Sequence, residues 1–144
     1  MNLIQLMKKL LADLSAFRIK SQYYHWNIEG PDFMQYHSLL GDIYEKAHGD
    51  VDDVAEHIRA LNSYSPGSLK RFAELTTIVD EETVPDALEM INRVYADNQT
   101  ILASARAACM AADAANEHGQ LNFLEGLIDT YEKQAWMLRS IIKR

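Results

Sequence analysis

The sequence predicts an all-α protein: four long helices in a bundle, with a short helix in the connection between the second and the third. Its 144 residues include only six Gly and three Pro, and 48% are hydrophobic, which favours long helices over a turn-rich sheet. Apolar residues recur in alternating steps of three and four along four stretches, as on one face of a helix. More than about twenty residues join the second and third stretches, a length that suits a crossover along a bundle.

The first long helix is predicted to start at Leu3. Lys8, Lys9 and Asp13 interrupt its apolar pattern, so it is expected to be neither a signal peptide nor a membrane span. Its core-facing stripe consists of Met7, Leu10, Leu14, Phe17, Ser21, Tyr24 and Ile28.

A Gly-Pro break then separates the first helix from the second. Gly30 accepts a left-handed cap and Pro31 fits the first turn of a new helix. The second helix is expected to begin near Asp32, whose carboxylate favours a helix start, and to run to about Leu61. Its stripe consists of Phe33, Tyr36, Leu40, Ile43, Ala47, Val51, Val54, Ile58 and Leu61.

The rest of the chain completes a single predicted domain over residues 1–144. After Ser65-Pro66-Gly67, a short helix is expected from Leu69 to about Leu75, and Pro85 is expected to open the third long helix. The pattern breaks around residues 116–119, and the fourth helix runs to the end of the chain. The two stripes consist of Leu88, Ile91, Tyr95, Asn98, Leu102, Ala105 and Cys109, and of Leu124, Leu127, Tyr131, Ala135, Leu138 and Ile142.

Two histidines and two carboxylates are candidates for a metal site. His25 closes the first helix and His37 lies on the second, where Asp52 and Glu56 stand four residues apart on one face. The fifteen steps from His37 to Asp52 span about 22 Å, so a second chain must supply the other half of the site. Antiparallel pairing of two such helices about residue 45 or 46 would give a two-fold interface with two identical sites. Imidazole and carboxylate ligands suit iron, manganese or zinc.

These residues resemble the ferroxidase signature of the miniferritins, the DNA-binding proteins from starved cells (Dps family). The resemblance covers nearly the whole chain and implies a ferritin-like four-helix bundle. The matching residues are His25-Trp26-Asn27, Gly30-Pro31, Phe33, His37, Asp52, Glu56, Pro66-Gly67-Ser68, Pro85-Asp86-Ala87 and Glu132-Lys133-Gln134-Ala135-Trp136-Met137-Leu138-Arg139-Ser140.

The resemblance also implies a function. Members of the family form a hollow homo-dodecamer that binds Fe(II), oxidises it preferentially with hydrogen peroxide rather than oxygen, and stores ferric mineral, which limits oxidative damage. His25 and His37 of one subunit, with Asp52 and Glu56 of its mate, would then be the catalytic residues and the iron ligands. For Trp26 the residue pattern favours core packing, whereas the resemblance implies an aromatic group that quenches oxidising equivalents beside the iron.

The chain departs from the family at Gly41, where a carboxylate usually helps to hold the weaker of two irons. His48 lies one turn before Asp52 and, in the antiparallel pairing, opposite Gly41 of the mate. The second iron is therefore expected to be weakly held or held partly by His48. A surface role for His48 remains equally open.

Two further groups of residues have alternative interpretations. Glu45 and His48 have the Glu-x-x-His spacing of larger di-iron bundles, but a site within one chain would need more facing glutamates, and the third helix offers chiefly Glu89. Near the fourth helix, acidic residues and a histidine fit either an ordinary helix start or, by the resemblance, an iron pore at a three-fold axis. These are Asp113, Glu117 and His118.

Charge and cysteine content bear on partners and compartment. The formal net charge of −7 gives no general attraction to nucleic acid or anionic membranes. The lone Cys109 excludes an internal disulfide, is expected to be a packing residue, and fits a reducing cytoplasm.

The alternative function is a catalytically weak structural or DNA-compacting shell. Members of the family that bind DNA usually do so through a Lys-rich or Arg-rich tail, and neither end of this chain has one. A modest basic strip on the first helix is expected to be a solvated face, so no direct DNA binding is expected. The strip consists of Lys8, Lys9, Arg18 and Lys20.

Overall fold

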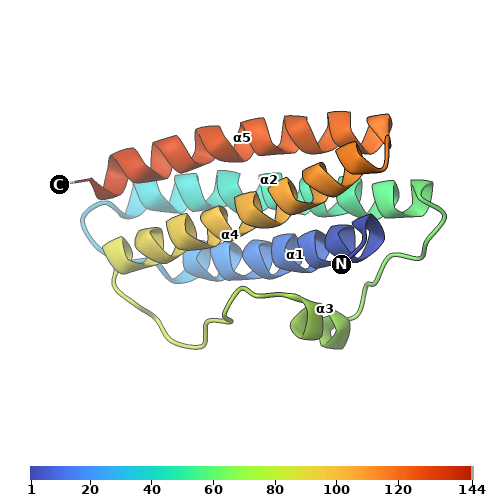
Figure 1. Cartoon of the computed structure of the whole chain (residues 1–144). Coiled ribbons are helices and arrows are strands. Elements are labelled where there is room, and N and C mark those ends of the chain that lie inside the picture. Colours follow the sequence, from blue (N-terminus) through green and yellow to red (C-terminus); the bar gives the residue numbers. More distant parts are fainter. Residues whose placement is uncertain (144) are drawn as a thin grey trace.

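The computed structural model describes residues 1–143, which contain five α-helices and no strand. Four long helices run alongside one another, and the short helix α3 lies outside them against α1 (Figure 1). The predicted all-α bundle with a short helix in the long connection is confirmed. The helices are α1 (Leu3–Asn27), α2 (Phe33–Ala60), α3 (Leu69–Leu75), α4 (Ala87–Ala114) and α5 (His118–Ile142).

Local sequence accounts for the ends of α1 and the start of α2. Asn2 and Gln5 form a capping box, in which each side chain accepts a hydrogen bond of 2.9 Å from the other residue's backbone N–H. Gly30 adopts a φ of 123° in the turn that follows α1. Asp32 occupies the N-cap of α2 as expected, but its side chain makes no capping hydrogen bond.

The start of α4 corrects one prediction. The helix begins at Ala87 and not at Pro85, because the carboxylate of Asp86 accepts a hydrogen bond of 2.9 Å from the backbone N–H of Glu89 and so serves as the N-cap. Between α4 and α5 the chain turns at Asn116, whose φ of 55° ends the first helix before His118 begins the next.

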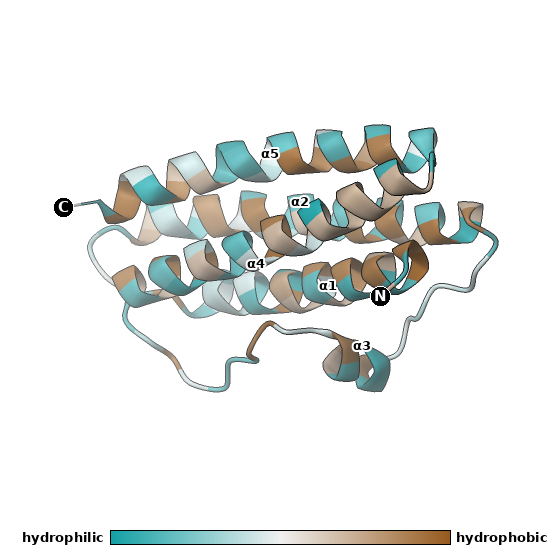
Figure 2. Ribbon diagram, in the orientation of Figure 1, coloured by the Kyte–Doolittle hydropathy of each residue, from teal (hydrophilic) through white to brown (hydrophobic). Residues whose placement is uncertain are grey.

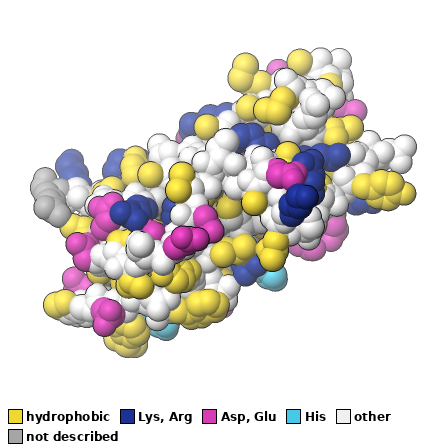
Figure 3. All heavy atoms as spheres, turned by 90° about the horizontal axis from the view of Figure 1, so that it is seen from below, with side chains coloured by type: hydrophobic (Ala, Val, Ile, Leu, Met, Phe, Trp, Pro, Cys, Tyr) yellow, Lys and Arg dark blue, Asp and Glu magenta, His cyan; other side chains and the backbone are white. Residues whose placement is uncertain are grey.

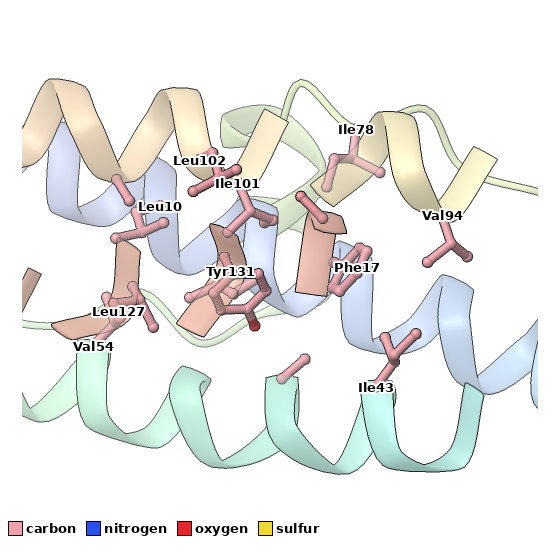
Figure 4. Close-up of a cluster of buried hydrophobic side chains, with 14 of the residues drawn as sticks. Leu10, Phe17, Ile43, Val54, Ile78, Val94, Ile101, Leu102, Leu127 and Tyr131 are labelled. Carbon is pink, nitrogen blue, oxygen red and sulfur yellow. The ribbon is translucent and has the colours of Figure 1, made fainter. Parts of the chain in front are cut away.

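The hydrophobic core lies between the four long helices. Side chains such as Phe17 and Ile43 point inward from α1 and α2 toward Tyr131 of α5 (Figure 4). Phe17 and Tyr131 meet edge to face with their ring centroids 6.3 Å apart. Hydrophobic residues alternate with polar ones along each helix (Figure 2), as an amphipathic bundle requires. All seven residues of the predicted stripe on α1 are buried.

A buried aspartate attaches the connection between α3 and α4 to the bundle. Asp13 of α1 is completely buried and accepts hydrogen bonds from Lys9 (2.6 Å), from the hydroxyl of Thr76 (2.7 Å) and from the backbone N–H of Thr77 (2.9 Å). Ser104 of α4 donates a further bond of 2.6 Å to the same carboxylate. One side chain therefore joins α1, the connection and α4.

Two more contacts hold the connection along α1. Lys20 is buried, pairs with Asp97 of α4 at 2.9 Å and donates to the carbonyl oxygen of Val79 at 2.8 Å. Further along, the hydroxyl of Tyr24 donates to Glu81 at 2.6 Å. Burial raises the pKa of Asp97, against the opposing effect of Lys20.

The predicted solvated basic strip on α1 is wrong for two of its four members. Lys9 and Lys20 point into the contacts just described, because buried or half-buried carboxylates of α1 and α4 face them. Arg18 donates to Gln22 of its own helix. No helix within residues 1–143 is long and apolar enough to cross a membrane.

Candidate metal centre

The two candidate histidines lie against each other. The turn at Gly30 folds α2 back along α1, so that the last turn of one helix meets the first turns of the next. The rings of His25 and His37 stack with their centroids 3.8 Å apart and their planes at 13°. Nδ1 of His25 lies 2.6 Å from the carbonyl oxygen of His37, and Nδ1 of His37 lies 2.8 Å from the carbonyl oxygen of His25.

This reciprocal pair of contacts sets the tautomer of both rings. A carbonyl oxygen can only accept a hydrogen bond, so each Nδ1 must carry the proton and donate. In a neutral imidazole the other nitrogen, Nε2, then keeps its lone pair for a ligand. A backbone carbonyl that accepts from the Nδ1–H of a metal-binding histidine also orients the ring and raises its basicity. Both histidines are therefore arranged as nitrogen donors.

Aromatic side chains on α2 enclose the histidine pair. Phe33 stacks on His37 with a centroid distance of 4.9 Å, and Tyr44 contacts His25 edge-on at 5.2 Å. Phe33, His37 and His25 are stacked in this order, and Tyr44 contacts the His25 ring edge-on. Sequence reasoning included Phe33 but missed Tyr44, which lies seven residues after His37 and so two turns further along the same helix face.

The stacking also limits how the two nitrogens can act. The lone pair of Nε2 lies in the plane of its ring, so an ion that it binds lies close to that plane. Two planes inclined by 13° do not meet near the rings. In this arrangement the histidine pair of His25 and His37 presents its lone pairs to two positions and not to one shared ion.

The two candidate carboxylates lie side by side further along α2. Asp52 and Glu56 are both exposed. A hydrogen bond with Asp52, reinforced by repulsion between the two carboxylates, raises the pKa of Glu56 above its ordinary value. Among residues 1–143 no Lys or Arg forms an ion pair with either side chain. A divalent cation between them would relieve this repulsion.

The candidate ligands lie in two separate groups within one chain. In the described part of the chain, no group of three or more His, Cys, Asp or Glu side chains is arranged to hold a metal ion. The continuous helix α2 separates His37 from Asp52 by about 22 Å. The alternative site within one chain fails, because Glu45 and His48 are exposed and Glu89 pairs instead with Arg93 at 3.1 Å.

His48 lies beside the carboxylates, as its spacing predicts. It is exposed and lines a groove of about 580 Å³ together with Asp52 and Asp53 of α2 and with Pro66 and Gly67 of the segment before α3. Its position allows it to contribute to an ion held at Asp52, and a role in metal binding stays a prediction.

The predicted core packing of Trp26 is wrong. Its side chain is 65% exposed, because it points away from the bundle at the last turn of α1. Met34 is 70% exposed nearby in sequence, and Phe33 is exposed as well. Large apolar side chains therefore stand uncovered on the segments that carry the histidine pair, as they do at interfaces between proteins.

The acidic residues at the junction of α4 and α5 are separate from these groups. Asp113, Glu117 and His118 are all exposed around the turn at Asn116. A pore at a three-fold axis would require other subunits, so that role stays a prediction. Cys109 is half-buried against the core, and burial raises the pKa of its thiol, in keeping with a packing residue.

The chain matches the model of the ferritin-like domain over residues 4–144. A low temperature-induced protein of Nostoc is 34% identical over 142 residues, which cover 97% of this chain and 79% of that one. The DNA protection during starvation protein 2 of Bacillus anthracis is 25% identical, over 98% of this chain and 97% of its own length.

A solved structure shows the same fold. The DPS protein of Vibrio cholerae, described as a member of a broad superfamily of ferritin-like diiron-carboxylate proteins, superimposes with a TM-score of 0.95 at 24% identity, over 98% of this chain and 89% of that one. This chain belongs to the ferritin-like domain family and, within it, to the Dps miniferritins.

Proposed function

We propose that the protein is a ferroxidase that binds Fe(II), oxidises it with hydrogen peroxide and stores the ferric product inside a closed shell of twelve subunits. Membership of the ferritin-like family supports iron storage in general. The observation that carries the specific proposal is the separation of two groups of donors. The histidine pair, with two available Nε2 atoms, lies where α1 meets the start of α2. Asp52 and Glu56 lie further along α2 and form no ion pair with a Lys or Arg of residues 1–143.

Two chains complete the site in this proposal. When α2 of one subunit lies antiparallel to α2 of its mate about residue 45 or 46, the histidine pair of each chain faces Asp52 and Glu56 of the other. Each imidazole nitrogen, together with these carboxylates, offers a donor set that suits Fe(II) at one of two neighbouring positions. The exposed side chains of Trp26 and Met34 would be covered in such a pair, which removes apolar surface from water.

The reaction needs only binding and orientation from the protein. Two Fe(II) ions each give one electron to hydrogen peroxide, whose O–O bond breaks. Two water molecules are consumed as well, and the products are two units of ferric oxide-hydroxide and four protons. The histidine pair and the carboxylates hold the ferrous substrate, and the net charge of −7 favours the approach of cations. Oxygen is the other candidate oxidant.

Direct DNA binding is not part of the proposal. Two of the four basic side chains on α1, Lys9 and Lys20, pair with carboxylates of the same chain and are withdrawn from any phosphate contact. Clear retardation of duplex DNA by the assembled protein at physiological salt would contradict this. We place the activity in the cytoplasm, where a lone thiol such as Cys109 stays reduced.

The test is anaerobic loading with Fe(II) followed by addition of hydrogen peroxide, with the ferric absorbance recorded over time. The variants are His37→Ala and Asp52→Ala, and Asp129→Ala, an exposed carboxylate on α5, is the matched control. We expect rapid oxidation to a dissolved ferric product in the native chain and the control, and its loss in both site variants. Equal precipitation of iron by all four proteins would contradict the proposal.

A further inference from the structure

Gly41 of α2 stands directly against the ring of His25. A Cβ atom built at this position would lie 3.1 Å from Cε1 and 3.3 Å from Nδ1 of that ring, closer than carbon atoms normally approach. At the other five glycines a Cβ would meet nothing within 4 Å. Within residues 1–143, Gly41 is therefore the one glycine whose missing side chain makes room for another residue.

Backbone conformation does not account for this glycine. Gly41 lies inside the 28-residue helix α2, and its φ is not positive. Glycine within a helix is unfavourable relative to alanine, because it loses more conformational freedom on folding. The structure instead explains the glycine at position 41 by the space that the His25 ring needs.

The His25 ring is restrained on other sides as well. Its Nδ1 is hydrogen-bonded to the carbonyl oxygen of His37 at 2.6 Å, one face lies on the His37 ring, and Tyr44 contacts it edge-on. A side chain at position 41 would displace the His25 ring. The displacement would either lengthen its hydrogen bond to the carbonyl oxygen of His37 or move the ring off the His37 ring. Either change would turn the Nε2 lone pair away from its present direction.

We propose that Gly41 is a positioning residue of the metal centre: its missing side chain allows the His25 ring to stack on His37 with Nε2 free to bind a divalent cation. The proposal rests on the proposed function, since it assumes that Nε2 of His25 binds the ferrous substrate. It follows that a carboxylate at position 41 would weaken the centre in this chain and not strengthen it.

A double-mutant cycle tests the contact. Gly41→Ala and His25→Ala are made singly and together in the full chain, with Gly126→Ala of α5 as the matched control, because a Cβ there meets nothing. We expect Gly126→Ala to leave the melting temperature of the metal-free protein unchanged or higher. Gly41→Ala should lower it in the native background and raise it once His25→Ala has removed the ring.

A second measurement tests the positioning role. Binding of Co(II), a redox-stable stand-in for Fe(II), is followed by anaerobic titration calorimetry. We expect the affinity of Gly41→Ala and of Gly41→Asp to fall by about 10- to 100-fold, the range typical for residues that orient a ligand, and that of Gly126→Ala to stay the same.

The outcomes separate this proposal from the one on which it depends. The role of Gly41 alone would be overturned if the changes in melting temperature caused by Gly41→Ala and His25→Ala were additive. Unchanged Co(II) affinity in Gly41→Ala would also overturn it. Tighter Co(II) binding by Gly41→Asp would do the same. Absence of Co(II) binding by the native chain would overturn the proposed function itself, whatever the stability cycle gives.

Discussion

At the scale of single residues, buried charges attach the crossover connection to the bundle. Asp13, Lys20 and Glu81 each contact segments far away in the sequence. No repeating pattern in the sequence predicts these contacts, because the partners lie in the connection and in α4. From the sequence alone, the basic residues of α1 therefore resemble a solvated face. The exposure of Trp26 is unpredictable for the same reason, because it depends on what the turn at Gly30 leaves uncovered.

Removal of the Asp13 carboxylate should destabilise the fold strongly. Asp13→Ala removes the carboxylate that Lys9 pairs with and that accepts from Ser104, Thr76 and Thr77, at a cost of about 3 kcal/mol in the free energy of unfolding. Guanidinium unfolding followed by circular dichroism measures the change, with Asp129→Ala as the exposed control. A midpoint equal to that of the control would show that the network contributes nothing.

Glu81 should make stability depend on pH in the acid range. The hydrogen bond from Tyr24, with further bonds from Thr83 and Arg93, lowers the pKa of Glu81 from 4.5 to about 2. A carboxyl group whose pKa is lower in the folded state stabilises the fold above its unfolded pKa, and this contribution disappears as the pH falls toward 2. Glu81→Gln should therefore melt at a lower temperature than the native chain at pH 7, and the difference should shrink below pH 4.5. A difference that is independent of pH would contradict this assignment.

At the scale of elements, most helix boundaries follow from local sequence. The alternating apolar pattern and the Gly-Pro break predict α1 and α2 closely, and Ser65-Pro66-Gly67 predicts where α3 follows, because capping and turn residues act within a few positions. Pro85 misleads by two residues, since the neighbouring Asp86 is the better cap. The stacking of His25 on His37 could not be predicted, because it depends on how α2 returns along α1.

The two aspartate N-caps should differ in strength. The side chain of Asp86 accepts the N–H of Glu89, whereas Asp32 makes no capping bond. Asp86→Ala should lower the free energy of unfolding by about 1 kcal/mol, and Asp32→Ala should change it by only a few tenths. Thermal melts of the two variants at pH 7 measure the contrast, and equal shifts would refute it.

At the scale of the whole molecule, one chain leaves apolar side chains uncovered. Its exposed apolar side chains gather in several groups between charged ones on the face that carries α3 (Figure 3). A groove of about 540 Å³ between α1 and α3 is lined by Ile19, Leu69 and Phe72. Together with the separation of the candidate ligands into two groups, these surfaces support the proposed assembly of several subunits.

In the proposed centre, each metal site takes its histidines from one chain and its carboxylates from another. The most direct test mixes His37→Ala and Asp52→Ala chains, unfolded and refolded together, and titrates the assembled product with Co(II). Each variant alone should bind weakly. Random pairing in the mixture should restore about one quarter of the native sites, because a mixed pair has one intact site and one doubly altered site. A mixture that binds no more than its separate components, beside a native chain that binds fully, would contradict a shared site.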